Sequence, residues 1–399
     1  MHYTADKDQR IDDKVEKDQE YINSRVLSFL GEHVHSILLC GGFGRGEGTV
    51  DVRSGEIHIV NDYDITILLK ERNKLKYAML YRKYHAPLQA LAVDLASDLR
   101  MKQIDLGLKH FSYFEKPAAL KIENYEVKQG HVLTYGDEDP TSSLPSWSAE
   151  DIPLFEGTWL FRNRGFGMLI SALYFMCEGG IPEHKKENFV IECGKAQLAM
   201  GDSILLLNRC YHHLYSERLC SLDPLDVSNV SDGEKIVMHY REALEQKLRP
   251  DFQQFYKRDL IEWWFEIVDL MDRFYRFYES KRLGIVFGDW IEYSDLPKPE
   301  DCFESKAFVS DILRNLSHMS MSTIKKSYNK ARKSYSIGIV SLLLFSMKKD
   351  GFYLPYMEKA SKLLNIPLTG NQREDWLHLV RCFLKEVHPG GEVASVIKL

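Results

Sequence analysis

The sequence predicts an α+β protein in which a small mixed-sheet domain, residues 1–145, precedes a larger all-helical region, residues 146–399. Segments that alternate apolar and polar residues, as half-buried strands do, are confined to the N-terminal domain. Beyond it, apolar residues recur almost everywhere at helical spacing. Between the two parts, residues 137–152 are rich in Pro, Ser and acidic residues, which is typical of a linker. We therefore place the boundary there, with further candidate boundaries near residues 225 and 300.

The N-terminal domain is expected to contain two helices and four strands. In chain order they are a helix over about residues 10–31, strands at Ser36–Cys40 and Glu56–Leu69, a helix over about 72–99, and strands at Lys102–Leu108 and near His131–Thr134. The third strand shows the pattern well, because Ile104, Leu106 and Leu108 alternate with Asp105 and Gly107.

The C-terminal region is expected to contain only helices. They cover about residues 153–178, 186–219, 232–248, 251–283, 303–318, 321–348, 354–363 and 372–386. No internal repeat and no low-complexity tract interrupts them.

The composition argues against two classes of protein. Apolar residues make up 44% and charged residues 28% of the chain, as in ordinary globular proteins. The net charge of −6 disfavours a protein dominated by contacts with a phosphate backbone, which usually carries a basic balance. The longest apolar run, Ile337–Phe345, is far shorter than the ~20 residues of a membrane span. We therefore expect no membrane partner.

The cysteines and the N-terminus favour a cytoplasmic location. Seven cysteines are scattered without a CxxC pair, so neither a zinc site nor a disulfide framework is expected. The first twenty residues are polar and charged, unlike a signal peptide. The sequence gives no indication of the oligomeric state.

A Gly-rich segment, GGFGRGEG at residues 41–48, directly follows the first predicted strand. Five glycines in eight residues allow a tight turn and a close approach of the backbone to a ligand. If a helix starts there, its free N–H groups form an anion site suited to a triphosphate. Taken alone, the segment is also explained by a flexible surface loop.

Three carboxylates form the second motif. Asp62 and Asp64 lie two residues apart in a predicted strand, so their side chains point to the same face. Two carboxylates side by side repel each other, and a divalent cation between them would remove that repulsion. Asp105, on another predicted strand, would complete an oxygen-ligand site suited to magnesium. Each Asp alone is also explained by a solvated strand face.

Together, in this order, the motifs resemble those of the polymerase-β-like nucleotidyltransferase superfamily. GGFGRGEG is similar to the GSxxRGE variant of minimal bacterial and aminoglycoside nucleotidyltransferases, and residues 123–137 resemble the strand and turn that close such domains. The resemblance covers roughly residues 30–140. It implies metal ligation by Asp62, Asp64 and Asp105, and phosphate contacts by Gly41, Gly42 and Arg45.

One helix beyond this domain extends the resemblance. In the same enzymes, a helix of the second domain carries a Lys toward the triphosphate, followed by a Gly-Asp pair. Lys195, with Gly201 and Asp202 after it, is similar. A surface salt bridge for Arg45 and a solvated helical position for Lys195 are the structural alternatives. The chain departs from the family in spacing, because 19 residues, from Phe43 to Asn61, separate the Gly pair from the first Asp. These residues predict a hairpin or a longer strand entry.

Other candidate motifs are weaker. His212 and His213 are adjacent and would face different sides of a helix, which disfavours metal binding. Aromatic residues around Trp263 and Trp264 are typical of a helix core. The basic run KKSYNKARK, residues 325–333, is either a solvated helix face or a contact for an anionic acceptor such as RNA. No P-loop or dinucleotide-binding motif is present.

The sequence thus favours a Mg²⁺-dependent nucleotidyltransferase with two ions. We expect it to move a nucleoside monophosphate, with AMP favoured, from an NTP to an acceptor hydroxyl or phosphate, releasing pyrophosphate. The net negative charge favours a small molecule or a protein as acceptor over RNA. Two alternatives remain on the same fold: a nucleotide-binding regulator without turnover, and a toxin–antitoxin-type interaction protein.

Overall fold

The computed structural model describes residues 1–53, 55–115, 120–298 and 333–387. The described chain forms two compact units. The first unit holds residues 1–153, 205–224 and 244–251, and the second holds the described residues of 154–204, 225–243 and 252–399. Two short segments from beyond residue 200 therefore pack with the N-terminal part of the chain.

The first unit contains a small mixed sheet with helices. Its elements are α1 Gln9–Leu30, η1 Gly31–His33, β1 Val34–Leu39, α2 Gly41–Gly44, β2 Val50–Arg53, β3 Glu56–Ile59, β4 Tyr63–Leu69, α3 Lys74–Asp98, β5 Ile104–Lys109, η2 Phe111–Tyr113, α4 Ile122–Gln129, β6 Val132–Tyr135, η3 Pro140–Ser143, η4 Ala149–Asp151 and α7 Tyr215–Leu222.

The remaining described elements are mostly helices. They are α5 Phe155–Glu178, η5 Glu183–Lys185, α6 Lys186–Leu207, α8 Gly233–Leu248, α9 Phe252–Tyr256, α10 Leu260–Leu283, α11 Trp290–Asp295, α14 Lys333–Ser346, β7 Met347–Lys348, β8 Gly351–Phe352, α15 Leu354–Leu364 and α16 Gln372–Val387. The predicted α+β class is confirmed, with a small mixed sheet and a larger helical region. The expectation that this region contains only helices is wrong, because β7 and β8 pair as two short antiparallel strands. None of the helices in these ranges combines the length and apolarity that a bilayer span requires.

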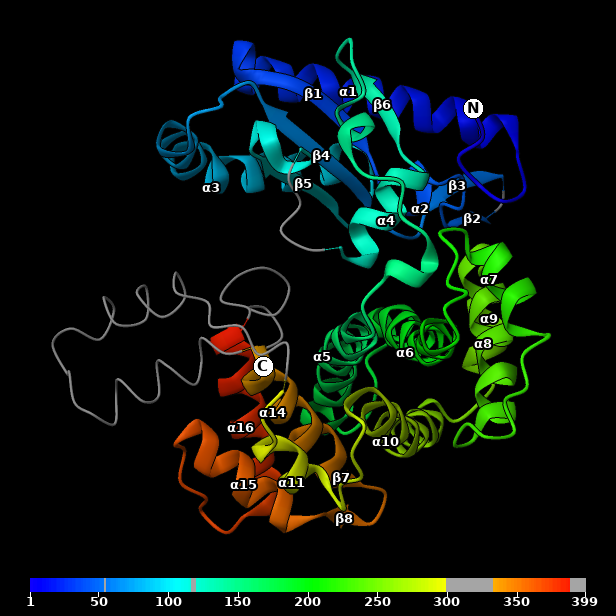
Figure 1. Cartoon of the computed structure of the whole chain (residues 1–399), viewed down its shortest axis with the longest axis vertical. Helices are drawn as coiled ribbons and strands as arrows, with labels where there is room; N and C mark the ends of the chain where they lie inside the picture. The colour runs from blue at the N-terminus through cyan, green and yellow to red at the C-terminus, as the bar shows by residue number, and fades with distance from the viewer. Residues whose placement is uncertain (54, 116–119, 299–332, 388–399) are drawn as a thin grey trace, which may run out of the picture. The chain divides into compact units, whose positions relative to one another are not determined.

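The main sheet has the strand order β5-β4-β1-β6. β4 and β5 run parallel, whereas β1 is antiparallel to both β4 and β6. The four strands lie side by side in Figure 1, near α1 and α3. The parallel pairing of β4 with β5 aligns two of the predicted site residues, Asp64 and Asp105.

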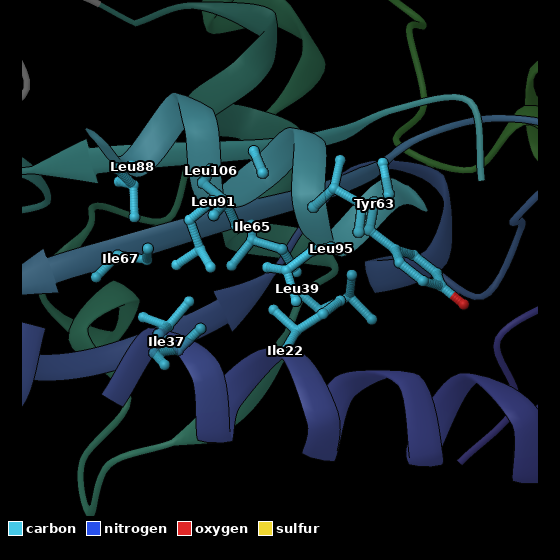
Figure 2. Packing of buried hydrophobic residues seen from close by; sticks show 14 of the residues in the cluster. Ile22, Ile37, Leu39, Tyr63, Ile65, Ile67, Leu88, Leu91, Leu95 and Leu106 are labelled. Carbon is cyan, nitrogen blue, oxygen red and sulfur yellow. The ribbon is translucent and has the colours of Figure 1, made fainter. Parts of the chain in front are cut away.

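Alternation along the strands decides which side chains enter the core. Ile22 of α1 and Leu91 and Leu95 of α3 pack on one face of the sheet, against residues such as Ile65 and Ile67 (Figure 2). Each such side chain contributes ~1.5–3 kcal/mol when it is fully buried. A one-residue slip of β4 would move Ile65 and Ile67 to the other face of the sheet, so the register of β4 is strongly specified. The residues that alternate with them along β4 therefore lie on the opposite face of the sheet.

The predicted single strand Glu56–Leu69 is wrong, because it is two strands in different sheets. β3 pairs with β2 in a separate hairpin, and β4 belongs to the main sheet. The Val60 N–H bonds to the Thr49 carbonyl at 3.0 Å and closes the base of the hairpin. The hairpin accounts for the long spacing between the Gly segment and Asp62.

Two further differences concern helices. Residues 122–129, expected to form part of a closing strand and turn, are helix α4, and only β6 after it is extended. The predicted helix 186–219 is broken, because Arg209 adopts φ +58° and ends α6 before α7 begins. His212 and His213 lie in the connection, with ring centroids 4.3 Å apart. The predicted helix 303–318 and residues 325–332 of the basic run lie outside the described residues.

Candidate metal centre

Three carboxylates meet at one end of the main sheet, as the sequence predicts. Asp62, Asp64 and Asp105 each offer an oxygen, and these oxygens all lie within 4.8 Å of one another. The parallel register of β4 and β5 places Asp64 opposite Asp105, while Asp62 directly precedes β4. A cluster of this kind can hold a hard metal ion, which prefers oxygen ligands.

Tyr63 explains why the two neighbouring carboxylates face the site. Its side chain is fully buried on the opposite face of the sheet, edge-to-face with Phe43 at a centroid distance of 4.9 Å. Its hydroxyl donates a hydrogen bond to Asp18 Oδ2 at 2.9 Å. Because successive strand residues alternate, burying Tyr63 on one face of the sheet places Asp62 and Asp64, both half-buried, on the other face.

Burial and the neighbouring carboxylates change the pKa of Asp64. Burial, together with the charges of Asp62 and Asp105, raises the pKa of Asp64 to about 7, although Arg45 and Lys247 oppose the shift. The ionised form of Asp64 is thus disfavoured by its burial and by its two acidic neighbours. A divalent cation would favour the ionised form, because it replaces the repulsion with attraction.

The Gly-rich turn is packed directly against this cluster. Gly41 has φ +62°, and a Cβ built on it would lie 1.8 Å from Asp64 Oδ2. The Cys40 N–H also bonds to the Asp64 carbonyl at 2.8 Å. Gly44 is equally constrained, because a Cβ there would lie 2.4 Å from the Leu39 carbonyl oxygen. Gly41 and Gly44 therefore need glycine because protein atoms occupy the space of a Cβ, and Gly42 lies next to Gly41 in α2. The close approach of a ligand to this turn stays a prediction.

Arg45 is engaged in an ion pair inside the first unit. Its side chain is 7% exposed, and Nη1 donates to Glu126 Oε2 at 2.8 Å. Its aliphatic part packs on Gly130, where a Cβ would come within 2.7 Å of Arg45 Cγ. The pair is buried rather than at the surface. A phosphate contact by Arg45 stays a prediction, while its charge already acts on Asp64.

Lys195 belongs to the second unit. Its ammonium group pairs with Glu192 Oε1 at 2.8 Å, one helical turn earlier in α6. The following Gly-Asp pair has a packing role, because a Cβ on Gly201 would lie 2.1 Å from the Tyr240 ring, whose hydroxyl donates to Asp202 Oδ1 at 2.9 Å. The proposed role of Lys195 at a triphosphate stays a prediction.

Lys247 is a cation near the cluster that sequence reasoning missed. It lies in the last turn of α8, in a segment that packs with the first unit. Its Nζ is 3.4 Å from Thr49 Oγ1 and 5.1 Å from the centre of the Tyr215 ring. Its charge lowers the pKa of Asp64. Nothing in the local sequence distinguishes it from other helical lysines.

Glu47 and Glu126 were also missed as structural partners of the turn. Glu47 accepts hydrogen bonds from the first residues of α7, and Glu126 forms ion pairs with Arg45 and Arg218. The position of Glu47 after the Gly turn does not indicate that its partner, Tyr215, lies more than 160 residues later in the chain.

Comparison with known proteins adds no assignment. No protein-family model matches the chain, and no curated protein or solved structure matches it. Any functional proposal therefore depends on the carboxylate cluster and the turn.

Proposed function

We propose that this protein is a Mg²⁺-dependent nucleotidyltransferase of the polymerase-β-like kind. It would transfer a nucleoside monophosphate, with AMP favoured, from an NTP to an acceptor hydroxyl or phosphate. The observation that carries the proposal is the packing of Gly41 against Asp64, one of three carboxylates that come together at the start of β4 and β5. Carboxylates that can hold a metal ion beside a glycine turn suit phosphoryl transfer, because this chemistry needs charge neutralisation and positioning rather than a covalent intermediate.

The three carboxylates have distinct roles in this proposal. Asp62 and Asp64 would both bind the two magnesium ions, and Asp105 would bind the ion on the acceptor side. When bound, such ions stabilise the attacking and leaving oxygens of an in-line displacement. Asp105 is the most exposed of the three, so we assign to it the proton of the acceptor hydroxyl. The acceptor oxygen forms a bond to the α-phosphorus, the bond from that phosphorus to the bridging oxygen breaks, and pyrophosphate leaves.

The triphosphate would lie along the Gly turn. Gly41 and Gly42 allow its phosphates to approach the backbone without a side chain in between. We assign to Lys247 the positive charge that would balance the triphosphate, because its charge lowers the pKa of Asp64 within the first unit. Arg45 would add charge from its ion pair with Glu126. The contact of Lys195 with the triphosphate, which the resemblance implies, stays a prediction.

Pyrophosphate release tests the proposed reaction. The protein would be incubated with Mg²⁺ and each of the four NTPs, as wild type, as Asp64→Asn and as the control Asp94→Asn. Asp94 is an exposed residue of α3. We expect release with at least one NTP, a loss of about a thousandfold or more in Asp64→Asn, and no change in Asp94→Asn.

The same experiment separates the alternative functions. Nucleotide binding without any release above the Asp64→Asn level would contradict the enzyme and favour a nucleotide-binding regulator. If α-labelled ATP is a substrate, the label will appear in the small-molecule, protein or RNA fraction of a lysate. That distribution identifies the class of acceptor.

A further inference from the structure

The Gly turn is tied at two points to a segment far along the chain, residues 211–218, which we name the anchor segment. It contains the end of the α6–α7 connection and the first turns of α7, and it packs with the first unit. Both ties come from the turn's own charged residues, Arg45 and Glu47. The two residues flank Gly46, which has a left-handed φ of +80°.

The first tie is the cap that Glu47 places on α7. The Glu47 side chain is buried, and Oε2 accepts the Tyr215 N–H at 2.6 Å. Oε1 accepts both the Ser216 N–H at 2.9 Å and the Ser216 hydroxyl at 2.7 Å. Both amides are among the unpaired donors at the start of a helix, where a carboxylate is also favoured by the helix dipole.

The second tie runs from Arg45 through Glu126 to Arg218. Glu126 Oε2 accepts a hydrogen bond from Arg45 Nη1 at 2.8 Å. Glu126 Oε1 accepts one from Arg218 Nη2 and another from the Tyr211 hydroxyl, the latter at 2.7 Å. Burial would raise the pKa of Glu126, but Arg45 and Arg218 outweigh this and lower it. Glu126 is therefore ionised at neutral pH.

Arg218 is held firmly on the anchor side. Its side chain is 1% exposed, and Nε donates to the His212 carbonyl at 2.7 Å. The guanidinium also lies 3.9 Å from the centre of the Tyr215 ring and 4.3 Å from that of Tyr211. A buried arginine with this many partners has little freedom to move, so Glu126 and Arg45 are fixed with it.

We propose that the anchor segment positions the Gly turn against the carboxylate cluster, which makes Glu47 and Arg218 positioning residues of the nucleotide site. The proposal rests on the proposed function for its catalytic part. Glycine gives a backbone more conformational freedom than other residues do, so side-chain contacts with neighbouring elements add order to a Gly-rich turn. The Glu47 cap and the Arg45–Glu126–Arg218 ion pairs restrain the turn and hold Gly41 in contact with Asp64.

Hydrogen exchange tests the anchoring without any assumption about activity. The full chain would be compared with Glu47→Gln, with the milder Ser216→Ala, and with the control Glu217→Gln, an exposed acid in the same turn of α7. We expect amide exchange in peptides covering residues 40–48 to accelerate about tenfold in Glu47→Gln, less in Ser216→Ala, and not in Glu217→Gln. Unchanged exchange of the turn in both test variants would overturn the proposal.

Nucleotide kinetics test the consequence for the site. If the wild type turns over, Glu47→Gln should raise KM for the Mg-NTP about tenfold with a smaller change in kcat, because the carboxylates themselves are untouched. Mn²⁺ binding without nucleotide should stay within about twofold of wild type. A loosened turn with unchanged KM would overturn the positioning role.

The two proposals fail in different ways. A wild type that neither binds nor uses any NTP would refute the proposed function, and the exchange data alone would then decide the anchoring. Release of pyrophosphate by the wild type, combined with an unaltered turn in Glu47→Gln, would refute only the positioning.

Discussion

Gly41 and Asp64 are so close that a Cβ on Gly41 would lie 1.8 Å from Asp64 Oδ2. The two residues belong to motifs that the hairpin β2–β3 separates in sequence. They meet because β1 and β4 are adjacent strands, and the turn leaves β1 where β4 begins. A metal held by the carboxylates would therefore have the backbone of the turn beside it.

Replacing Gly41 with Ala should disable the site. The new methyl group must displace the Asp64 carboxylate, and the left-handed φ of +62° costs ~1–2 kcal/mol for any residue with a Cβ. We expect loss of Mn²⁺ binding and of NTP turnover by about a hundredfold or more, with the protein still folded. Gly55→Ala is the matched control, because it has a left-handed φ of +85° and nothing within 4 Å of the added Cβ. Equal losses in both variants would show that the backbone penalty, and not the contact, is responsible.

Asp64 should make stability depend on pH. Because its pKa is raised to about 7, the folded protein keeps a proton that the unfolded chain releases near the ordinary value of 3.8. The free energy of unfolding should therefore fall as the pH rises from about 4 to 7, and Asp64→Asn should remove part of that fall. At about pH 8 the variant should be more stable than wild type by roughly 1–3 kcal/mol in urea unfolding without metal.

The same titration predicts how metal binding responds to pH. Protons compete with the metal for Asp64 below its pKa, so stabilisation by Mg²⁺ or Mn²⁺ should grow between about pH 6 and pH 8. Asp64→Asn should abolish this gain, whereas Asp94→Asn should keep it. Metal stabilisation that is independent of pH in the wild type would argue against Asp64 as a ligand.

Lys247 and Lys195 can be distinguished by matched substitutions. We expect Lys247→Met to raise KM for the Mg-NTP about tenfold, because its charge already acts on Asp64. Lys195→Met should change KM less than about twofold, since its ammonium group pairs with Glu192. The reverse result would support the assignment made from the resemblance. Steady-state kinetics at several NTP concentrations is the measurement.

Gly201 should matter for packing and not for chemistry. A Cβ at this position would lie 2.1 Å from the Tyr240 ring, so Gly201→Ala should lower the free energy of unfolding by about 1–3 kcal/mol. Gly194→Ala in the same helix meets nothing within 4 Å and should be neutral or stabilising by up to about 1 kcal/mol. Thermal and urea unfolding of both variants checks the difference. Similar effects of the two substitutions would contradict the packing argument.

Local patterns in the sequence were sufficient for most strands of the main sheet and for the residues of the carboxylate cluster. Alternation in Ile104–Leu108 and in the second half of Glu56–Leu69 reports directly on burial of one sheet face, so it predicts both the strand and the direction of its polar residues. The single strand expected over Glu56–Leu69 was wrong because the alternation of apolar and polar residues runs through both β3 and β4. Alternation does not indicate with which strand each half of the segment pairs.

The sequence by itself determined that Asp62 and Asp64 share a face and that glycines follow the first strand, because both properties depend only on neighbours in the chain. Tertiary structure alone decided that Asp105 lies opposite Asp64, that Arg45 pairs with Glu126, and that Lys247 acts on the cluster. These contacts join residues far apart in the chain. Their partners are selected by sheet order and by the return of two later segments to the first unit, and no local pattern encodes either.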